Sequence, residues 1–253
     1  MSKKIDQLIF ERKLVRSRTF AQELIKEQQV SILSQGEWVL VKKPSQLVSE
    51  DVEIRINENP LNKYVSRAGL KLDGALNRLN VDVTNKICLD IGASTGGFTD
   101  CLLQRGADQI VSIDVGQGQL DLKISRNPKV HSLEKINARN LLDYKEFLEV
   151  YPEGGFDVVV MDVSFISMTL ILNSIQKVLK KDGLLISLVK PQFELGPENL
   201  DKHGIVKNSL LFSELQSKIE KSINENNLQY LNYIESPIEG KDGNKEFFVY
   251  AKK

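Results

Sequence analysis

The spacing of apolar residues changes within the first 58 positions, from helical intervals of three and four residues to short strand-like runs. Helices are predicted around Ile5–Ile9 and Phe20–Ile25, and Thr19 and Gln22 have the spacing of a capping box at the start of the second helix. Two small helices packed on a small sheet are therefore expected over residues 1–58. The strand-like runs are Val30–Leu33, Trp38–Val41 and Val52–Ile56.

A second pattern follows a polar, proline-containing stretch, residues 59–65, which we interpret as a linker. Ser66–Leu79 has apolar positions on one helix face, and strand-like and helix-like segments alternate from residue 86 onward. This alternation is typical of an α/β domain, here residues 66–253, with a mostly parallel sheet covered on both faces. The expected strands are Ile87–Ile91, Ile110–Val115, Lys129–Leu133, Val158–Val163 and Leu184–Lys190, with helices at Phe98–Arg105, Thr169–Leu179 and Ser209–Asn226 and a closing strand pair at Tyr230–Ile234 and Glu246–Ala251.

Composition narrows the class of protein without naming a function. The net charge is zero, so any affinity for nucleic acid must come from a local basic surface. The two cysteines, Cys88 and Cys101, form no CxxC pair and are expected to be free and buried, with no disulfide framework and no metal. The N-terminal residues lack the apolar core of a signal peptide, and no apolar run has the length of a membrane span. A cytoplasmic protein is expected.

Three glycines follow the predicted strand Ile87–Ile91 and precede a helix. Gly92, Gly96 and Gly97 allow a tight turn and the close approach of a ligand to the backbone. About twenty residues later the next predicted strand brings Asp114, whose carboxylate could accept hydrogen bonds from ribose hydroxyls. The combination indicates a nucleoside-bearing cofactor, and by itself it fits either a dinucleotide or S-adenosylmethionine.

The same loop also matches the G-x-S-x-G nucleophile elbow of α/β-hydrolases, with Ser94 as the nucleophile. Asp162 and His203 follow in the chain order that such a triad requires. The context disfavours this alternative, because an elbow follows several strands of its sheet and Ile87–Ile91 is predicted to be the first strand.

Two charged residues stand at the ends of apolar runs. Asp162 follows Val158–Met161, and Lys190 follows Leu184–Val189. Charges at such positions are rarely buried without partners, so a shared site is indicated. A simple ion pair at the rim of the sheet is the alternative.

Several motifs together resemble the TlyA (haemolysin A-like) ribosomal RNA 2′-O-methyltransferases, whose catalytic domain is of the FtsJ/RrmJ type. The N-terminal segment beginning Lys-Ile-Asp-Gln-Leu resembles an S4 RNA-binding domain. The resemblance covers nearly the whole chain. The motifs are Ser66-Arg-Ala-Gly-Leu-Lys71, Asp90-Ile-Gly-Ala-Ser-Thr-Gly-Gly-Phe-Thr99, Asp162-Val-Ser-Phe165, Val-Lys190-Pro-Gln-Phe-Glu194 and Gly-Asn-Lys-Glu246-Phe.

This resemblance implies a Rossmann-like methyltransferase sheet with an antiparallel last strand, and S-adenosylmethionine as cofactor. It also implies a catalytic tetrad at Lys71, Asp162, Lys190 and Glu246. Lys71 and Glu246 come from the resemblance alone. Lys190 is the candidate base for a ribose 2′-hydroxyl, although which lysine takes the proton stays open. The implied cofactor residues are Gly92, Ala93, Ser94, Thr95, Gly96, Gly97, Phe98, Asp114, Asn137 near the adenine, and Asp162.

Ribosomal RNA or ribosomal subunits are the expected partners, with cytidine suggested by the family and no membrane or metal involved. Two clusters of basic residues could contact RNA phosphates. Such contacts give affinity that does not depend on the base sequence. The alternatives are a non-catalytic RNA-binding or ribosome-assembly factor and a pore-forming haemolysin. The candidate RNA-binding residues are Arg12, Lys13, Arg16, Arg18, Lys63 and Arg67.

Overall fold

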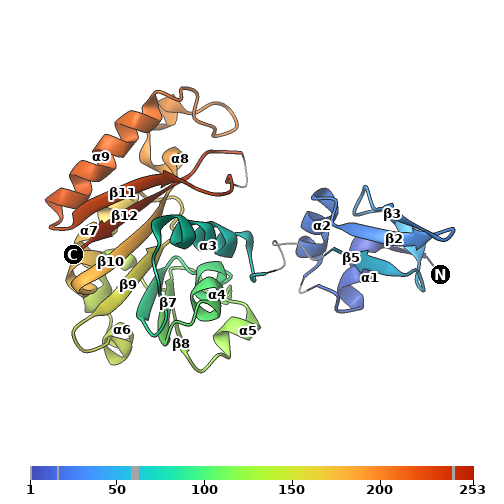
Figure 1. Ribbon diagram of the computed structural model, residues 1–253, viewed down its shortest axis with the longest axis horizontal. Helices are drawn as coiled ribbons and strands as arrows, with labels where there is room; N and C mark the ends of the chain where they lie inside the picture. The colour runs from blue at the N-terminus through green and yellow to red at the C-terminus, as the bar shows by residue number, and fades with distance from the viewer. Residues whose placement is uncertain (1, 16, 58–62, 241–242) are drawn as a thin grey trace. The chain divides into compact units, whose positions relative to one another are not determined.

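The computed structural model describes residues 2–15, 17–57, 63–240 and 243–253. The chain divides into two compact units, residues 1–62 and 63–253, and each is described by itself (Figure 1). The expected linker, residues 59–65, falls largely on positions outside the described ranges.

The helices of the first unit bury the faces that the sequence predicts. Ile5, Leu8 and Ile9 are buried, as is the apolar stripe of the second helix. The predicted capping box is wrong, because Ser17 is the N-cap and its hydroxyl accepts from the Phe20 amide at 3.1 Å. Gln22 instead donates to the buried Asp6, so tertiary contact decides its role. The helices are α1 (Ile5–Glu11) and α2 (Arg18–Lys26).

Two small antiparallel sheets complete the first unit. The three-stranded sheet has the order β3-β2-β5, and its inward side chains pack on both helices in one apolar core. The two-stranded sheet β1-β4 was not predicted, because strands of three residues are too short to show an alternating pattern. The strands are β1 (Ser2–Lys4), β2 (Val30–Ser34), β3 (Glu37–Leu40), β4 (Leu47–Ser49) and β5 (Ile54–Ile56).

A seven-stranded sheet organises the second unit, in the order β11-β12-β10-β9-β6-β7-β8. Five strands are parallel, and β12 runs antiparallel to both of its neighbours, as expected. The chain turns from one half of the sheet to the other between β6 and β9, and open α/β sheets bind ligands at the carboxyl ends of strands at such a point. The strands are β6 (Ile87–Ile91), β7 (Gln109–Asp114), β8 (Val130–Glu134), β9 (Phe156–Met161), β10 (Leu179–Val189), β11 (Gln229–Glu235) and β12 (Phe247–Lys252).

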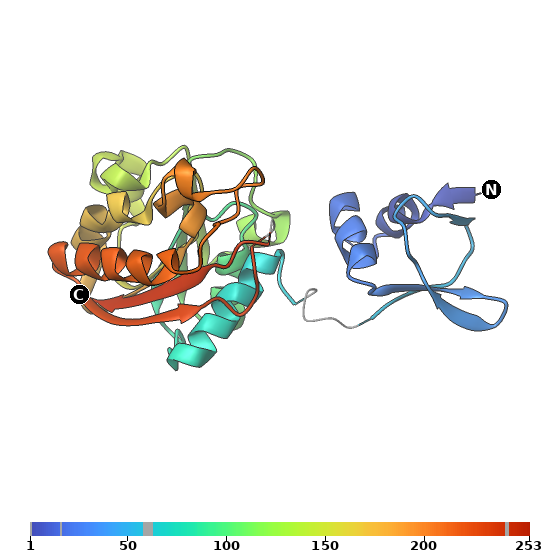
Figure 2. The ribbon, with the colours of Figure 1, turned by 90° about the horizontal axis from the view of Figure 1, so that it is seen from above.

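Helices cover both faces of this sheet (Figures 1 and 2). One core joins α3 and α4 to one face, and a larger core joins η2, α6, α7 and α9 to the other. These elements are α3 (Arg67–Leu79), α4 (Gly97–Gln104), α5 (Leu122–Ser125), η2 (Ala138–Asp143), α6 (Lys145–Val150), η3 (Met168–Ile171), α7 (Leu172–Val178), α8 (Pro191–Glu194), η4 (Pro197–Asn199) and α9 (Leu211–Glu225).

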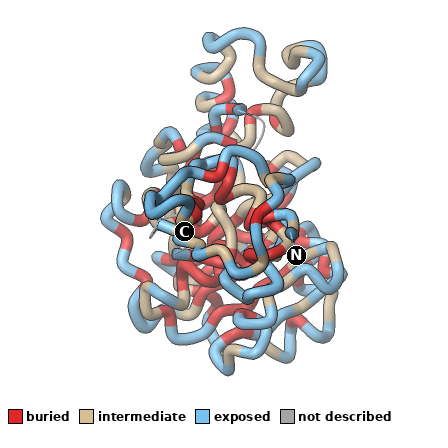
Figure 3. Tube along the Cα trace, turned by 90° about the vertical axis from the view of Figure 1, so that its right-hand side faces the viewer, coloured by how far each residue is buried: buried red, intermediate tan, exposed pale blue. Residues whose placement is uncertain are grey.

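The central strands are buried on both faces, which explains their nearly continuous apolar sequence. In Figure 3, buried segments are red and exposed segments pale blue along the chain. Along β6, Cys88 contributes to the core beneath α3 and α4, whereas Leu89 and Ile91 contribute to the opposite core. Cys88 and Cys101 are free and buried, as predicted. Burial raises the pKa of the Cys101 thiol to about 12, so this thiol stays protonated and unreactive at neutral pH.

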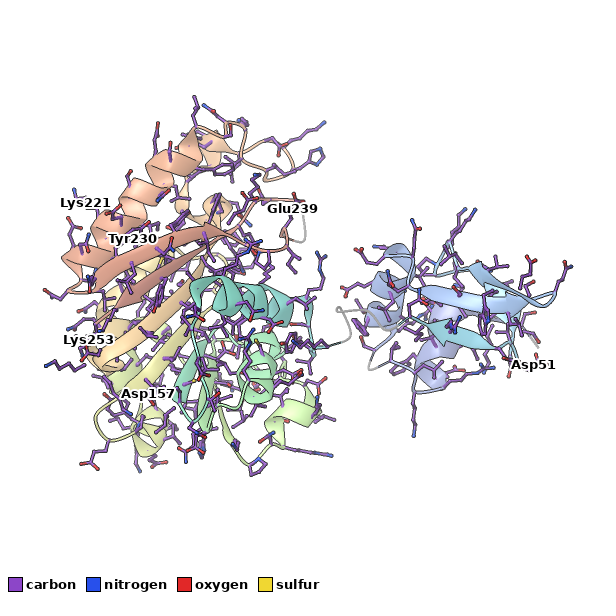
Figure 4. The ribbon with its side chains drawn as sticks, in the orientation of Figure 1. Asp51, Asp157, Lys221, Tyr230, Glu239 and Lys253 are labelled. Carbon is purple, nitrogen blue, oxygen red and sulfur yellow. The ribbon has the colours of Figure 1, made fainter. Side chains whose placement is uncertain are left out.

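α9 packs on one face of the sheet, next to the edge strand β11. Gln216 on this helix donates to the Tyr230 hydroxyl on β11 at 3.0 Å, while the Lys221 side chain is 77% exposed on the outer side (Figure 4). Within the described ranges, no helix combines the length and apolar character that crossing a membrane requires.

Candidate functional site

The loop between β6 and α4 passes close to the end of β9, and glycine is required there. Gly92 has a φ of +81°, and a Cβ at this position would lie 2.5 Å from the Asp162 carbonyl oxygen. Gly96, with a φ of +93°, forms the N-cap of α4. Any larger residue at position 92 would therefore push the loop away from the end of the neighbouring strand.

Asp114, the last residue of β7, fixes this loop with both carboxylate oxygens. Oδ2 accepts from the Ser94 amide at 2.8 Å, and Oδ1 accepts from the Gly116 amide at 2.7 Å. Each oxygen has a second lone pair, so hydrogen bonds to a ligand hydroxyl remain possible.

A cavity of about 440 Å³ opens at the carboxyl ends of the parallel strands. It lies between the glycine loop, Asp114 and the residues after β8 and β9, and its walls combine apolar side chains with a few polar groups, as is usual for a nucleoside site. Asn137 is part of the wall, where its side chain also accepts from the Arg139 amide. Its residues include Ile91, Gly92, Ser94, Asp114, Val115, Gly116, Gln119, Ile136, Asn137, Ala138, Asp162, Val163, Ser164, Phe165 and Ile166.

Asp162 and Lys190 meet beside this cavity. Lys190 Nζ lies 2.6 Å from Asp162 Oδ1 and donates to the Ser164 hydroxyl at 2.8 Å. The predicted strand ends were slightly late, since β9 ends at Met161 and β10 ends at Val189, so both charged residues lie just beyond the strands. The two side chains are 16% and 12% exposed, which leaves them accessible to a ligand without full hydration.

A smaller cavity of about 190 Å³ adjoins the first and shares four wall residues with it. Of these two cavities, Lys190 is among the described residues that line the smaller one, together with the start of α3 and the glycine loop. The arrangement gives two compartments that meet at Asp162. The smaller one is lined by Ser66, Ala68, Gly92, Ala93, Ser94, Thr95, Phe98, Asp162, Ser164 and Lys190.

Lys71 and Glu246 form a second ion pair, with Lys71 Nζ 2.5 Å from Glu246 Oε2 and both side chains nearly buried. Val189 pairs with Phe247 across β10 and β12, so Lys190 and Glu246 are the next facing positions of the two strands. Neither Lys71 nor Glu246 is among the described residues that line the two cavities. The four tetrad residues thus form two pairs, and in the described part of the chain the Asp162–Lys190 pair lines the two cavities.

Asp90, the fourth residue of β6, is a buried acid that the sequence analysis did not single out. Thr99 Oγ1 donates to its Oδ2 at 2.6 Å, while Oδ1 is buried without a hydrogen-bond partner among the described residues. Burial raises the pKa of this carboxyl to about 7, assisted by the charges of Asp162 and Asp114 and opposed by Thr99. An acid in a strand that otherwise reads as apolar is the signal that could have identified it.

Phe165 was also missed as an individual residue, although its motif was quoted for the family. Its side chain is 91% exposed at the wall of the larger cavity, and its φ is +65°, a rare conformation for an aromatic residue. The Phe193 ring lies 5.1 Å away between centroids. An exposed ring in a strained loop beside a cavity is a candidate contact for a planar ligand.

The catalytic triad that the hydrolase alternative requires is not formed among the described residues. The Ser94 hydroxyl donates to Gln119 at 3.1 Å, and Asp162 is paired with Lys190. The His203 amide donates to Asp201, and the described residues show no hydrogen bond between the His203 side chain and Ser94. Nor does the described part of the chain contain a group of three or more His, Cys, Asp or Glu residues that could hold a metal.

Several of the candidate RNA-binding residues make internal contacts. Arg12 donates to the carbonyl oxygens of Val52 and Glu50, and Arg18 pairs with the buried Asp6 at 2.8 Å. Lys63 pairs with Asp73. Lys13 and Arg67 have no side-chain partner among the described residues, and Arg16 lies outside the described ranges. Arg12 and Arg18 therefore contribute to the packing of the first unit whether or not they contact RNA.

Comparison with known families matches residues 64–253 to the model described as FtsJ-like methyltransferase. The chain belongs to the FtsJ-like methyltransferase family. The predicted enzyme class and the cofactor S-adenosylmethionine are thereby confirmed, and the cavities are interpreted below in terms of that cofactor.

Similar proteins cover almost the whole length. The "16S/23S rRNA (cytidine-2'-O)-methyltransferase TlyA" of Mycobacterium tuberculosis is 35% identical over 252 residues, covering 98% of this chain and 89% of the relative. "Hemolysin A" of Brachyspira hyodysenteriae is 36% identical over 247 residues, covering 98% of each. The solved "Putative hemolysin from Streptococcus thermophilus" has a TM-score of 0.75 at 35% identity, covering 100% of this chain and 88% of that structure. The predicted resemblance to the TlyA group is confirmed.

Proposed function

We propose that this chain transfers the methyl group of S-adenosylmethionine to ribose 2′-hydroxyls of ribosomal RNA, with cytidine as the nucleotide. The observation that carries the proposal is the Asp162–Lys190 pair, which joins a nucleoside-sized cavity to a smaller cavity lined by the glycine loop. The substrate class comes from the relatives, which are named as ribosomal RNA cytidine-2′-O-methyltransferases.

The larger cavity fits the cofactor in size and chemistry. Asp114 would accept hydrogen bonds from the ribose hydroxyls, and Asn137 would lie near the adenine between apolar side chains. The unsubstituted backbone at Gly92 leaves room for close approach. S-adenosylmethionine supplies an electrophilic methyl group on a positively charged sulfur, which the carboxylate of Asp162 would stabilise electrostatically.

Lys190 is the proposed base, because it lines the smaller cavity, whereas Lys71 pairs with Glu246 and is not among the described residues that line either cavity. The uncharged form of Lys190 Nζ would accept the proton of the 2′-hydroxyl as the hydroxyl oxygen bonds to the methyl carbon and the bond between that carbon and sulfur breaks. Asp162 and Ser164 hold Nζ in a fixed direction, and holding reactants in line contributes much of the rate in such reactions. Glu246 and Lys71 would complete the charge balance beside it.

The first unit is proposed to be an S4-type module that adds affinity for RNA, and the reaction is proposed to take place in the cytoplasm. Within the second unit, the exposed Phe165 ring offers a surface for stacking a base beside the cavity. The ribose of such a nucleotide would then lie near Lys190.

The experiment that tests the function is transfer of a tritiated methyl group to naked ribosomal RNA, to each ribosomal subunit and to whole ribosomes. Mapping of the labelled ribose identifies the nucleotide. We expect alkali-resistant linkages at cytidine, since a 2′-O-methyl group blocks cleavage of the adjacent phosphodiester. Label confined to bases, or no transfer to any of these substrates, would contradict the proposal.

The role of Asp114 has a separate test. Asp114→Ala removes the acceptor for ribose and also frees the amides of Ser94 and Gly116. We expect the dissociation constant of S-adenosylmethionine, measured by calorimetry, to rise about tenfold or more, since a hydrogen bond to a charged group contributes about 1.5–3 kcal/mol. An unchanged constant would remove Asp114 from the cofactor site.

A further inference from the structure

Three successive contacts join the loop after β9 to the short segment Lys190–Glu194 that follows β10. Lys190 Nζ donates to the Ser164 hydroxyl at 2.8 Å. The rings of Phe165 and Phe193 lie 5.1 Å apart. Glu194 provides the third contact and the most extensive one. The segment that carries the proposed base thus also holds the loop that contributes to the wall of the cofactor cavity.

Glu194 binds the far end of this loop with both oxygens. Oε1 accepts from the Met168 amide at 2.8 Å, and Oε2 accepts from the Ser167 hydroxyl at 2.5 Å. The residue is 7% exposed, so water does not replace these hydrogen bonds easily. Its own position is fixed from the other side, because Lys218 on α9 donates to the Glu194 carbonyl oxygen at 2.8 Å.

The loop needs such anchors because it contains a strained residue. Phe165 has a φ of +65° with its ring 91% exposed, so neither backbone preference nor burial stabilises its conformation. Conformations of this kind persist only where the surroundings fix them on both sides. Ser164 precedes Phe165 and is held by Lys190, while Ser167 and Met168 follow it and are held by Glu194.

We propose that Glu194 is a positioning residue that holds the Ser164–Met168 loop against the Lys190 segment, so that the cofactor wall and the base keep a fixed relative position. The expected effect on the rate of methyl transfer rests on the proposed function. The expected effect on the loop rests on the contacts of Glu194 alone. Glu194 lines neither of the two cavities and touches no reacting group.

The test compares Glu194→Ala with Glu194→Gln in the full chain. Glutamine keeps an oxygen for the Met168 amide and a polar group for Ser167, whereas alanine keeps neither. We expect E194A to lower kcat about tenfold or more and to change the KM for S-adenosylmethionine less than threefold, since Asp114 and the glycine loop lie on other strands. E194Q should stay within threefold of the unchanged protein. Glu198→Ala is the matched control, because Glu198 is exposed and lies four residues further along the chain.

Hydrogen–deuterium exchange of residues 163–170, measured without cofactor or RNA, separates the two proposals. We expect E194A to accelerate exchange at the Met168 amide about tenfold or more, and E198A to leave it unchanged. Unchanged exchange in E194A, a kcat within twofold, or equal loss in E194Q and E194A would overturn the positioning role. If the unchanged protein transfers no methyl group, the proposed function fails while exchange still decides the role of Glu194.

A second variant keeps the test decisive if E194A does not fold. Ser167→Ala removes the hydroxyl that binds Oε2 and leaves the Met168 contact in place. We expect a smaller effect in the same direction, with kcat reduced about threefold and exchange of residues 163–170 accelerated. If S167A changes neither kcat nor the exchange of residues 163–170, the proposal is overturned.

Discussion

At the scale of single residues, Lys190 and Lys71 differ in what their amines face. Lys190 Nζ faces a cavity and contacts Asp162 and Ser164, whereas Lys71 Nζ contacts the nearly buried Glu246. The sequence marked Lys190 by its place after an apolar strand. Lys71 has no distinguishing feature in the sequence, because a lysine on a helix is expected to be exposed. Its pairing with Glu246 is seen only in the folded structure.

Lys190→Ala should lower methyl transfer by a factor of about 10²–10⁴, the usual contribution of a positioned general base. S-adenosylmethionine should still bind, since Lys190 is not among the described residues that line the larger cavity. Single-turnover transfer and calorimetry measure the two quantities. Lys177→Ala, at an exposed position on α7, is the control. Turnover in K190A close to that of K177A would exclude Lys190 as the base.

Asp90 gives the protein a pH-dependent stability. Its pKa is about 7 in the folded chain and close to the ordinary value of about 3.8 in the unfolded chain, mainly because of burial. Between these values the folded state binds more protons than the unfolded state, so the free energy of unfolding falls as pH rises from about 4 to 7.

Asp90→Asn removes the ionising group and should remove this part of the pH dependence. We therefore expect the stability of D90N relative to the unchanged protein to be higher at pH 8 than at pH 5, by on the order of a few kcal/mol. Urea denaturation at the two pH values measures the difference. The same relative stability at both values would show that Asp90 does not change its protonation in the folded state.

At the scale of elements, the sequence located β6 to the residue, and most other strands within a few residues. Apolar runs define strands that are buried on both faces, but where a strand ends depends on where its ladder of hydrogen bonds stops. Gly92 shows the same dependence on neighbours. The sequence indicated a tight turn there, and only the fold shows that the Asp162 carbonyl oxygen fills the space beside it.

Gly92→Ala should destabilise the second unit by about 1–3 kcal/mol and weaken S-adenosylmethionine binding, because both the positive φ and the close carbonyl oxygen oppose a Cβ. Gly154→Ala is the matched control, since Gly154 also has a positive φ, of +78°, but open space around it. Thermal melting and calorimetry measure both effects. If G92A and G154A lose the same stability and G92A binds the cofactor normally, the close approach at Gly92 has no functional consequence.

At the scale of the whole molecule, the two units have separate cores and different proposed tasks. The sequence separates them by a change in apolar spacing. The basic residues of the first unit looked equivalent in the sequence, yet Arg12 and Arg18 bind groups of their own unit, whereas Lys13 has no side-chain partner among the described residues. The S4 assignment of this unit stays a prediction.

Removal of the first unit should weaken RNA binding and reduce its salt dependence. A chain of residues 63–253 retains both cores of the methyltransferase unit and should keep its affinity for S-adenosylmethionine. Fewer phosphate contacts release fewer counterions, so the slope of log affinity against log salt should decrease. Binding of ribosomal RNA at several salt concentrations measures this slope. Equal affinity and equal slope for both chains would exclude a role of the first unit in holding RNA.

The sequence by itself determined the two units, the α/β class, the glycine loop, Asp114 and the strand-end residues Asp162 and Lys190. It could do so because apolar periodicity, glycine at tight turns and charge after a buried strand are local signals. Only the tertiary structure decided that Lys71 pairs with Glu246, 175 positions away. It also decided that Glu194 holds the loop around Phe165. Such contacts depend on which strands lie next to each other in the sheet. The spacing of residues along the chain does not show which strands these are.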